Sequence, residues 1–117
     1  MHSRIIIKKD VKKFSDGWHN VQIQSIRQIT KKNGHAMVVV CFINKKNGEF
    51  QEFFSLSGYF QFRLFNLINC LFEYDPDDGE EFDLKDLEGE KIKIFIESRE
   101  SNEKIYQNIT DFAPWGR

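Results

Sequence analysis

Two Asn-Gly pairs divide the first half of the chain into three segments of strand length. Asn33-Gly34 and Asn47-Gly48 each follow two lysines, and both residues of such a pair accept the positive φ of a tight hairpin turn at low cost. The segment between the pairs, residues 36–43, is rich in β-branched side chains, which favour strands. With residues 18–29 before it and 49–56 after it, the sequence predicts a three-stranded meander.

The alternation of apolar and polar side chains in residues 18–29 changes phase once. Val21 and Ile23 are in phase with each other, whereas Ile26 is not in phase with them. A slip of this kind indicates a β-bulge, in which one extra residue bends the strand. We therefore expect the first strand to be long and bent.

Between residues 59 and 72 the apolar residues recur at the spacing of a helix. The side chains that share one helical face are Phe60, Leu64, Leu67, Ile68 and Leu71. Ser57-Gly58 supplies the capping region expected before such a helix. Residues 82–87 are expected to form a short helical turn. Residues 91–98 and 104–112 alternate again and predict two more strands, joined by a hairpin loop at 100–103.

This order of elements predicts a mostly β fold: a five-stranded OB-type barrel with one helix between strands three and four. Another small α+β sheet is the alternative. The chain has 117 residues, of which 40% are hydrophobic and 30% charged, which is typical of one globular domain. We therefore predict a single OB-fold-like domain over residues 1–117.

Charge is distributed unevenly along the chain. Residues 73–90 form an acidic loop region with ten carboxylates and one lysine, Lys85, and so carry −9. Because the whole chain carries −1, the remainder carries +8. Residues 1–15 form a basic leader, with a short edge strand expected at residues 4–8. A basic surface beside an acidic lobe is therefore expected, and the local charge decides which partners bind.

Neither an apolar span nor an export signal is recognisable. The longest apolar run, residues 36–43, is far shorter than the roughly 20 residues of a membrane helix, and the N-terminus lacks the residue order of a signal peptide. A cytoplasmic location without membrane contact is therefore expected. Cys41 and Cys70 lie in apolar segments and are expected to be buried, reduced thiols.

Motifs of catalysis and metal binding are missing from the sequence. His2, His19 and His35 do not cluster, and the chain has no phosphate-binding loop, nucleophile elbow or His-Glu-x-x-His motif. We therefore predict no catalytic residue, no cofactor and no metal. A metal-dependent nuclease, with ligands from the acidic region, is a further alternative that divalent-dependent loss of substrate would reveal.

Several segments between residues 17 and 114 stand in an informative order. They are WHNVQIQSI, the KKNG turn, MVVVCF, EFFSL, the predicted helix, LEGEKIKIFIES and IYQNITDFAP. In this order and spacing the chain resembles the small OB-fold single-stranded-DNA-binding proteins of phages and prophages. The resemblance implies binding of single strands without sequence specificity in DNA replication or recombination, often by an oligomer. Many bacterial single-strand binders end in an acidic tail that recruits partners, whereas this sequence ends DFAPWGR.

A single strand offers two features to a protein: a phosphate at each nucleotide and an unpaired base with two flat faces. A general binder therefore needs cations along a groove and aromatic rings between them. Aromatic residues make up 15% of the chain. Five of the phenylalanines are assigned to the core: Phe14, Phe60, Phe72, Phe82 and Phe112.

The candidate nucleic-acid-binding residues are of two kinds. The rings predicted to stack on bases, because they are out of phase with the apolar side of their strand or open a strand, are Trp18, Phe42, Phe53, Phe95 and Tyr106. The cations predicted to contact phosphates, from the two hairpin turns and the strands, are Arg27, Lys31, Lys32, His35, Lys45, Lys46, Lys93, Arg99 and Lys104.

The sequence thus predicts a homo-oligomeric single-stranded DNA binder, with replication or recombination proteins as further partners. RNA is not distinguished from DNA, because no feature would contact a 2′-hydroxyl. The alternative is a protein-interaction or structural adaptor domain on the same OB fold, in which the exposed rings contact a protein. The salt dependence of binding distinguishes these two interpretations. The affinity for phosphates falls steeply as the salt concentration rises, whereas the affinity of an apolar interface hardly changes.

Overall fold

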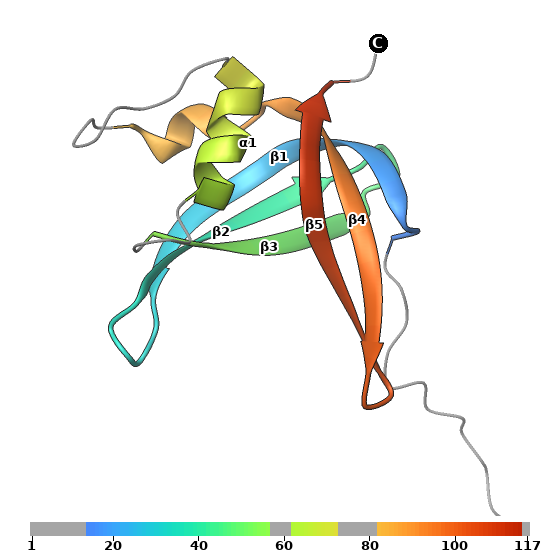
Figure 1. Cartoon of the computed structure of the whole chain (residues 1–117). Coiled ribbons are helices and arrows are strands. Elements are labelled where there is room, and N and C mark those ends of the chain that lie inside the picture. Colours follow the sequence, from blue (N-terminus) through green and yellow to red (C-terminus); the bar gives the residue numbers. More distant parts are fainter. Residues whose placement is uncertain (1–13, 57–61, 73–81, 116–117) are drawn as a thin grey trace, which may run out of the picture.

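Five antiparallel strands form one sheet in the order β3-β2-β1-β4-β5 (Figure 1). The computed structural model describes residues 14–56, 62–72 and 82–115. Its elements in chain order are β1 (Gly17–Thr30), β2 (Ala36–Ile43), β3 (Glu49–Ser55), α1 (Phe62–Phe72), the 3-10 helix η2 (Leu84–Leu87), β4 (Lys91–Ser101) and β5 (Lys104–Pro114). The predicted mostly β fold, with five strands and a helix between the third and fourth, is confirmed.

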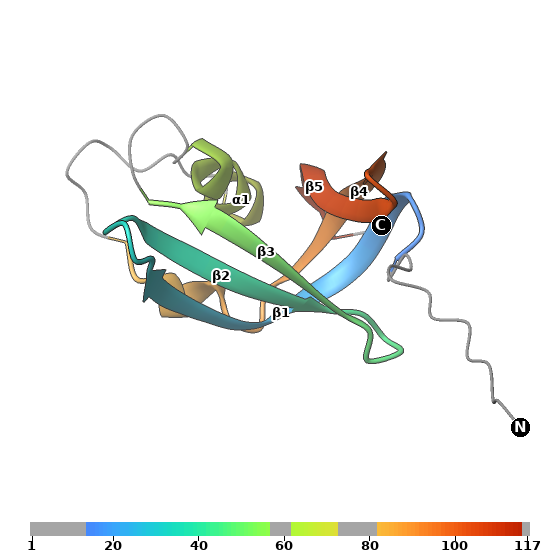
Figure 2. The ribbon, with the colours of Figure 1, turned by 90° about the horizontal axis from the view of Figure 1, so that it is seen from below.

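The long first strand holds the sheet together. Its residues Gln22–Thr30 pair with β2, and its residues Gly17–Gln22 pair with β4. The register with β2 shifts between Ile23 and Ser25, which confirms the predicted bulge. Because the bulge bends β1, the β4–β5 pair, which lies beside the first half of β1, stands at an angle to β2 and β3 (Figure 2).

Each of the two Asn-Gly turns has a positive φ at one residue of its pair and not at both. Gly34 has a φ of 86° and Asn47 a φ of 62°. In the second turn, Asn44 Oδ1 accepts hydrogen bonds from the N–H groups of Lys46 and Gly48, at 2.9 and 2.8 Å. A Cβ on Gly48 would lie 2.9 Å from the Asn44 side chain, so any other residue here would displace the side chain that accepts these two hydrogen bonds. The β4–β5 turn is shorter than predicted, since both strands continue to Ser101 and Lys104.

The core lies between the sheet and α1. Alternate side chains of each strand point inward, and α1 contributes Leu64, Leu67 and Ile68. Burying such a side chain contributes about 1.5–3 kcal/mol. The largest fully buried side chains are Phe42, Phe54, Ile23, Leu67, Ile68, Leu87, Ile92, Ile94 and Ile96.

The core assignments of the phenylalanines are confirmed for three and wrong for one. Phe14 is buried, and Phe82 and Phe112 pack against the core. Phe72 is 38% exposed, because the buried face of α1 is formed by its leucine and isoleucine side chains, and its ring packs against Phe82 instead. Phe60, Ser57-Gly58, the leader up to residue 13 and residues 73–81 lie outside the described residues.

The two edge strands, β3 and β5, are joined by side chains. Over the described residues no ladder pairs them, so the sheet is not closed. Glu52 of β3 and Arg63 of α1 both contact the backbone of Ile109 in β5. We call this line between β3 and β5 the seam.

Candidate functional site

The strand register places most of the predicted site residues on one face of the sheet, which we call the outer face because the opposite face carries the core. One row across this face runs from Arg27 through Val39 to Phe53. On the other half of the sheet, Trp18 lies opposite Phe95, and Asn20 opposite Lys93. Residues distant in sequence thus share one surface.

Phe53 presents its ring on the first half of the outer face. Its side chain is 45% exposed, whereas its neighbour Val39 is only 1% exposed although it points outward. The next row carries Cys41, whose Sγ donates a hydrogen bond to Gln24 Oε1 at 3.4 Å. Burial raises the pKa of the Cys41 thiol, Glu49 raises it further, and Arg27 opposes this shift.

The β1–β2 turn places three predicted cations at the end of this half. Lys31, Lys32 and His35 are exposed. The turn is held by hydrogen bonds from Gly34 N–H to Lys31 O at 2.9 Å and from His35 N–H to Asn33 Oδ1 at 3.1 Å. The other hairpin pair, Lys45 and Lys46, is exposed at the β2–β3 turn. The backbone of both turns is therefore fixed, while the lysine side chains extend into solvent.

The second half of the outer face carries an aromatic pair. Trp18 is 46% exposed and packs edge to face on Phe95, with ring centroids 5.1 Å apart. Lys93 lies two residues before Phe95 and is half-buried on the same face. Nearer the β4–β5 turn, the Arg99 guanidinium lies 5.7 Å from the centroid of the Tyr106 ring, and Lys104 is exposed.

Phe42 was predicted to stack on a base, and this prediction is wrong. Phe42 is 0% exposed and pairs with Ile23 and Phe50, whose side chains point into the core. Its segment, VVVCFI, is apolar at every position and so gives no indication of which side faces inward. Strand register alone settles the question.

Two residues that the sequence analysis did not select also belong to this face. Lys91 Nζ lies 5.2 Å from the centroid of the Trp115 ring, which is 37% exposed. Lys91 alternates with Ile92 as Lys93 does, so the rule that found Lys93 would also have found it. Trp115 follows the last predicted strand, and no periodic pattern marks it.

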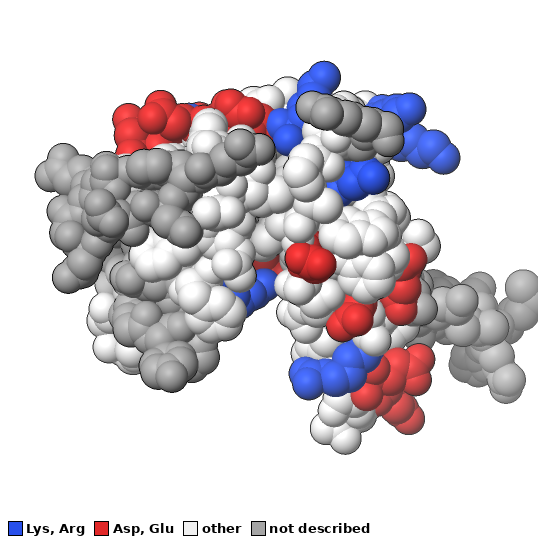
Figure 3. Space-filling view, turned by 45° about the horizontal axis from the view of Figure 1, so that its top comes forward, with Lys and Arg blue, Asp and Glu red and all other residues white. Residues whose placement is uncertain are grey.

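Acidic residues limit the basic part of the surface. Asp111 lies opposite Phe95 on β5, and Glu97 lies further along β4. Figure 3 shows Lys and Arg gathered beside the described C-terminal end of β5, and Asp and Glu on the side of η2. One of these acids has a structural role, because Glu88 Oε2 accepts a hydrogen bond from Ile26 N–H at 3.0 Å and lies 3.5 Å from Lys85 Nζ.

Metal and membrane features are missing from the described part of the chain. Within it, no group of three or more His, Cys, Asp or Glu side chains could hold a metal ion. None of its helices is long and apolar enough to cross a membrane. Cys41 and Cys70 are free cysteines, the first buried and the second half-buried.

The fold and this surface define a small protein with an open five-stranded antiparallel sheet, one helix and an outer face of aromatic and basic side chains. Comparison with models of protein families and with curated proteins found no match.

Proposed function

We propose that this chain binds single-stranded DNA, without sequence preference, across the outer face of its sheet. One observation carries the proposal: Trp18, Phe53, Phe95 and Tyr106, which come from four strands, share a face with Arg27, Lys93 and Arg99. Exposed rings stack on bases of any identity, and the cations beside them neutralise phosphates.

Single strands suit this surface better than duplex. Stacking on Trp18 or Phe53 needs an unpaired base with a free face, which a duplex hides inside its stack. Phosphate contact from the hairpin lysines adds affinity that carries no sequence information. The expected role is in phage-type DNA replication or recombination, with a homo-oligomer as the active form and a cytoplasmic location.

We further propose that the sheet is an OB-type barrel opened along the seam. The edges β3 and β5 are the strands whose pairing would close it, and Glu52 and Arg63 bridge them. OB folds are partly open five-stranded barrels that bind oligonucleotides on the face of strands two and three and with the loops beside it. Phe53, Lys31 and Lys32 occupy that face and its first loop.

The test is fluorescence anisotropy of a labelled oligo-dT, with duplex and RNA competitors, at two salt concentrations and with EDTA present. The key variant is Phe53→Ser, and Phe65→Ser is its matched control, because Phe65 is 38% exposed on α1, away from the outer face. Loss of one stacked base predicts about 5- to 150-fold weaker binding by Phe53→Ser. Equal affinity of the two variants for oligo-dT, or no binding of oligo-dT by the parent chain at low salt, would contradict the proposal.

Exposed rings on α1 favour the second candidate, a protein-interaction domain. Phe62, Phe65 and Phe72 are 54%, 38% and 38% exposed. If oligo-dT fails to bind, we expect these rings to contact a partner protein, with an affinity that hardly changes with salt. Phe65→Ser should then weaken binding of that partner.

A further inference from the structure

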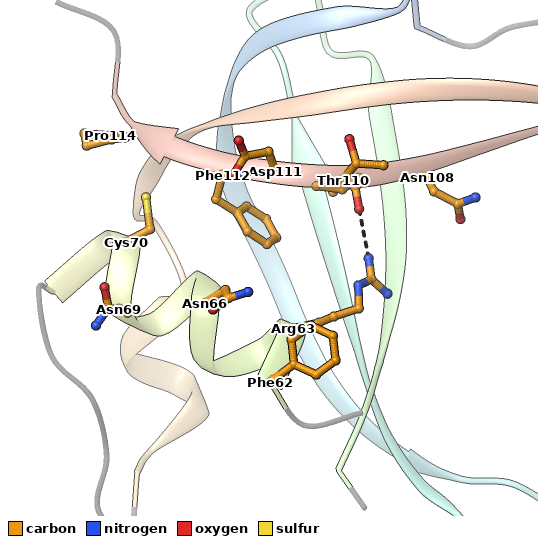
Figure 4. Close-up of a pocket in the computed structure, with 11 residues that line it drawn as sticks. Phe62, Arg63, Asn66, Asn69, Cys70, Asn108, Thr110, Asp111, Phe112 and Pro114 are labelled. Carbon is orange, nitrogen blue, oxygen red and sulfur yellow. Dashed lines mark hydrogen bonds between the residues drawn. The ribbon is translucent and has the colours of Figure 1, made fainter. Parts of the chain in front are cut away.

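A groove of about 880 Å³ lies between α1 and β5, on the helix side of the seam (Figure 4). Pockets that hold small organic ligands measure about 300–1,000 Å³. None of the residues that carry the proposed function lines this groove. Its chemistry can therefore be judged separately from that of the outer face.

The charged side chains of the groove disfavour an anion, since a carboxylate, Asp111, lines it and its cation is already engaged. Among the described residues Arg63 is the only lining cation, and its guanidinium lies 3.4 Å from the Glu52 carboxylate and donates to Ile109 O at 3.1 Å. A free anion would have to compete with Glu52 for Arg63. A neutral ligand is therefore favoured over a phosphate or a carboxylate.

The edge of β5 in the groove is also poorly suited to pairing with another strand. Ile109 N–H donates to Glu52 Oε2, and Phe112 N–H donates to the side chain of Asp111, each at 2.8 Å. Pro114 has no N–H to donate. Because strand addition needs unpaired backbone donors in a row, an added peptide strand would find few of them here.

Side chains supply the available hydrogen-bonding groups instead. Asn66 of α1 and Asn108 of β5 both line the groove, Asn108 further along β5 beyond Arg63 (Figure 4), and both are exposed. Phe62, at the start of α1, adds an aromatic ring that is 54% exposed. Each carboxamide offers both donors and an acceptor, so the groove combines an aromatic ring with neutral groups that pair with a flat heterocycle.

We propose that this groove binds a nucleobase, and adenine in preference to the others. A carboxamide pairs with adenine through two hydrogen bonds, to N6 and N7, whereas guanine is read mainly by Arg or Lys, and Arg63 is already engaged. The base comes from a free nucleoside or from a strand on the outer face; only the second source rests on the proposed function.

The experiment titrates the full chain with adenosine, guanosine, cytidine and thymidine, while the side-chain amide resonances of Asn66 and Asn108 are followed by NMR. Adenosine is expected to shift both resonances and to bind about 5- to 150-fold more tightly than the other nucleosides. It should also slow the alkylation of Cys70, which lines the groove. No shift with any nucleoside, or equal affinity for thymidine, would overturn the proposal.

Variants make the test specific. Asn66→Ala is expected to remove adenosine binding, and Asn20→Ala, which changes an exposed asparagine of the outer face, is expected to leave it unchanged. Alanine has a higher helix propensity than asparagine, so α1 should tolerate the change. Adenosine binding that survives Asn66→Ala and Asn108→Ala combined would refute the site.

Two further arms identify the source of the base and separate the two proposals. Oligo-dA that shifts the Asn66 and Asn108 resonances, where oligo-dT does not, assigns the base to a bound strand. Shifts with adenosine alone assign it to a free nucleoside. Phe53→Ser should weaken oligo-dT binding and leave adenosine binding unchanged. If the chain does not bind oligo-dT at all, the proposal for the outer face fails, and adenosine binding still tests the groove.

Discussion

The carboxylate of Glu52, on β3, accepts a hydrogen bond from the backbone N–H of Ile109, on β5, at 2.8 Å. Arg63 donates to the carbonyl of the same residue at 3.1 Å, so both backbone groups of Ile109 are satisfied by side chains. Glu52 Oε1 also accepts from Phe53 N–H at 3.3 Å. Buried backbone groups must be paired. The side chains of Glu52 and Arg63 thus supply, at Ile109, the hydrogen bonds that a β3–β5 ladder would supply.

Replacing Glu52 with alanine should destabilise the fold strongly. Glu52 is only 7% exposed, and its loss leaves Ile109 N–H without its acceptor and the Arg63 guanidinium without its ion-pair partner. Breaking a buried ion pair costs about 3–5 kcal/mol. Because the Arg63 side chain is 34% exposed and water can reach it, we expect about 2–3 kcal/mol, measured by urea unfolding.

The matched control for Glu52→Ala is Glu49→Ala, on the same strand. Glu49 is exposed, and surface changes of this kind usually alter stability by less than about 0.5 kcal/mol. If the two variants unfold at the same urea concentration, the side-chain bridge contributes nothing to closing the seam.

Alternation predicted the faces of the strands only where polar residues mark them. In β4 the pattern Ile92, Ile94 and Ile96 is unambiguous, and it correctly placed Phe95 on the other side. In β2 every residue from Val38 to Phe42 is buried, so the sequence lacked the contrast that would have put Phe42 in the core. The bulge in β1 was predictable because it shifts a visible pattern.

The seam and the groove were not predictable from local patterns. Arg63 belongs to helix α1. The spacing of the apolar residues in this helix predicts its buried face, but not the contacts of its polar residues. The bonds of Arg63 to Phe53 O and Ile109 O depend on the angle between the β4–β5 pair and β3. The contact of Lys91 with Trp115 was not predictable either. It joins positions that only the pairing of β4 with β5 brings together.

The lysines of the β1–β2 turn should contribute to affinity through counterion release. The double variant Lys31→Gln, Lys32→Gln is expected to weaken binding of oligo-dT and to flatten the plot of log affinity against log salt. Each lost phosphate contact lowers the steepness by about 0.7 for a single strand. Lys85→Gln is the control, since Lys85 lies in η2 beside Glu88. An unchanged slope in the double variant would exclude phosphate contact at this turn.

Trp18 should report on binding by its fluorescence. In a Trp115→Phe background, Trp18 is the only tryptophan, because the chain has two, and a base stacked on its exposed ring should quench its emission. Trp18→Ala should weaken oligo-dT binding by about 5- to 150-fold, the effect of one stacked base. Phe65→Ala serves as the control. Unchanged emission at saturating oligo-dT would mean that the Trp18–Phe95 pair is not a stacking site.

The two thiols should react slowly at neutral pH. Burial raises the pKa of both Cys41 and Cys70, and nearby acids, Glu49 for the first and Asp111 for the second, raise it further. Alkylation proceeds through the thiolate. The folded protein should therefore react with iodoacetamide more slowly than the same chain in urea, and Cys70, which is less buried than Cys41, should react first. Equal rates in the folded and unfolded chain would contradict the raised pKa values.

The same raised pKa values predict a loss of stability in alkaline solution. Because the thiols ionise more readily in the unfolded chain than in the folded one, the unfolded chain binds fewer protons once the pH exceeds the ordinary thiol pKa. The stabilisation is thus complete below that pH and is lost as the pH rises through the raised values. The double variant Cys41→Ser, Cys70→Ser has no thiol to ionise, so its melting temperature should fall less steeply above this pH than that of the parent. Parallel curves for the two proteins, recorded by thermal unfolding across the alkaline range, would show that thiol ionisation is not coupled to folding.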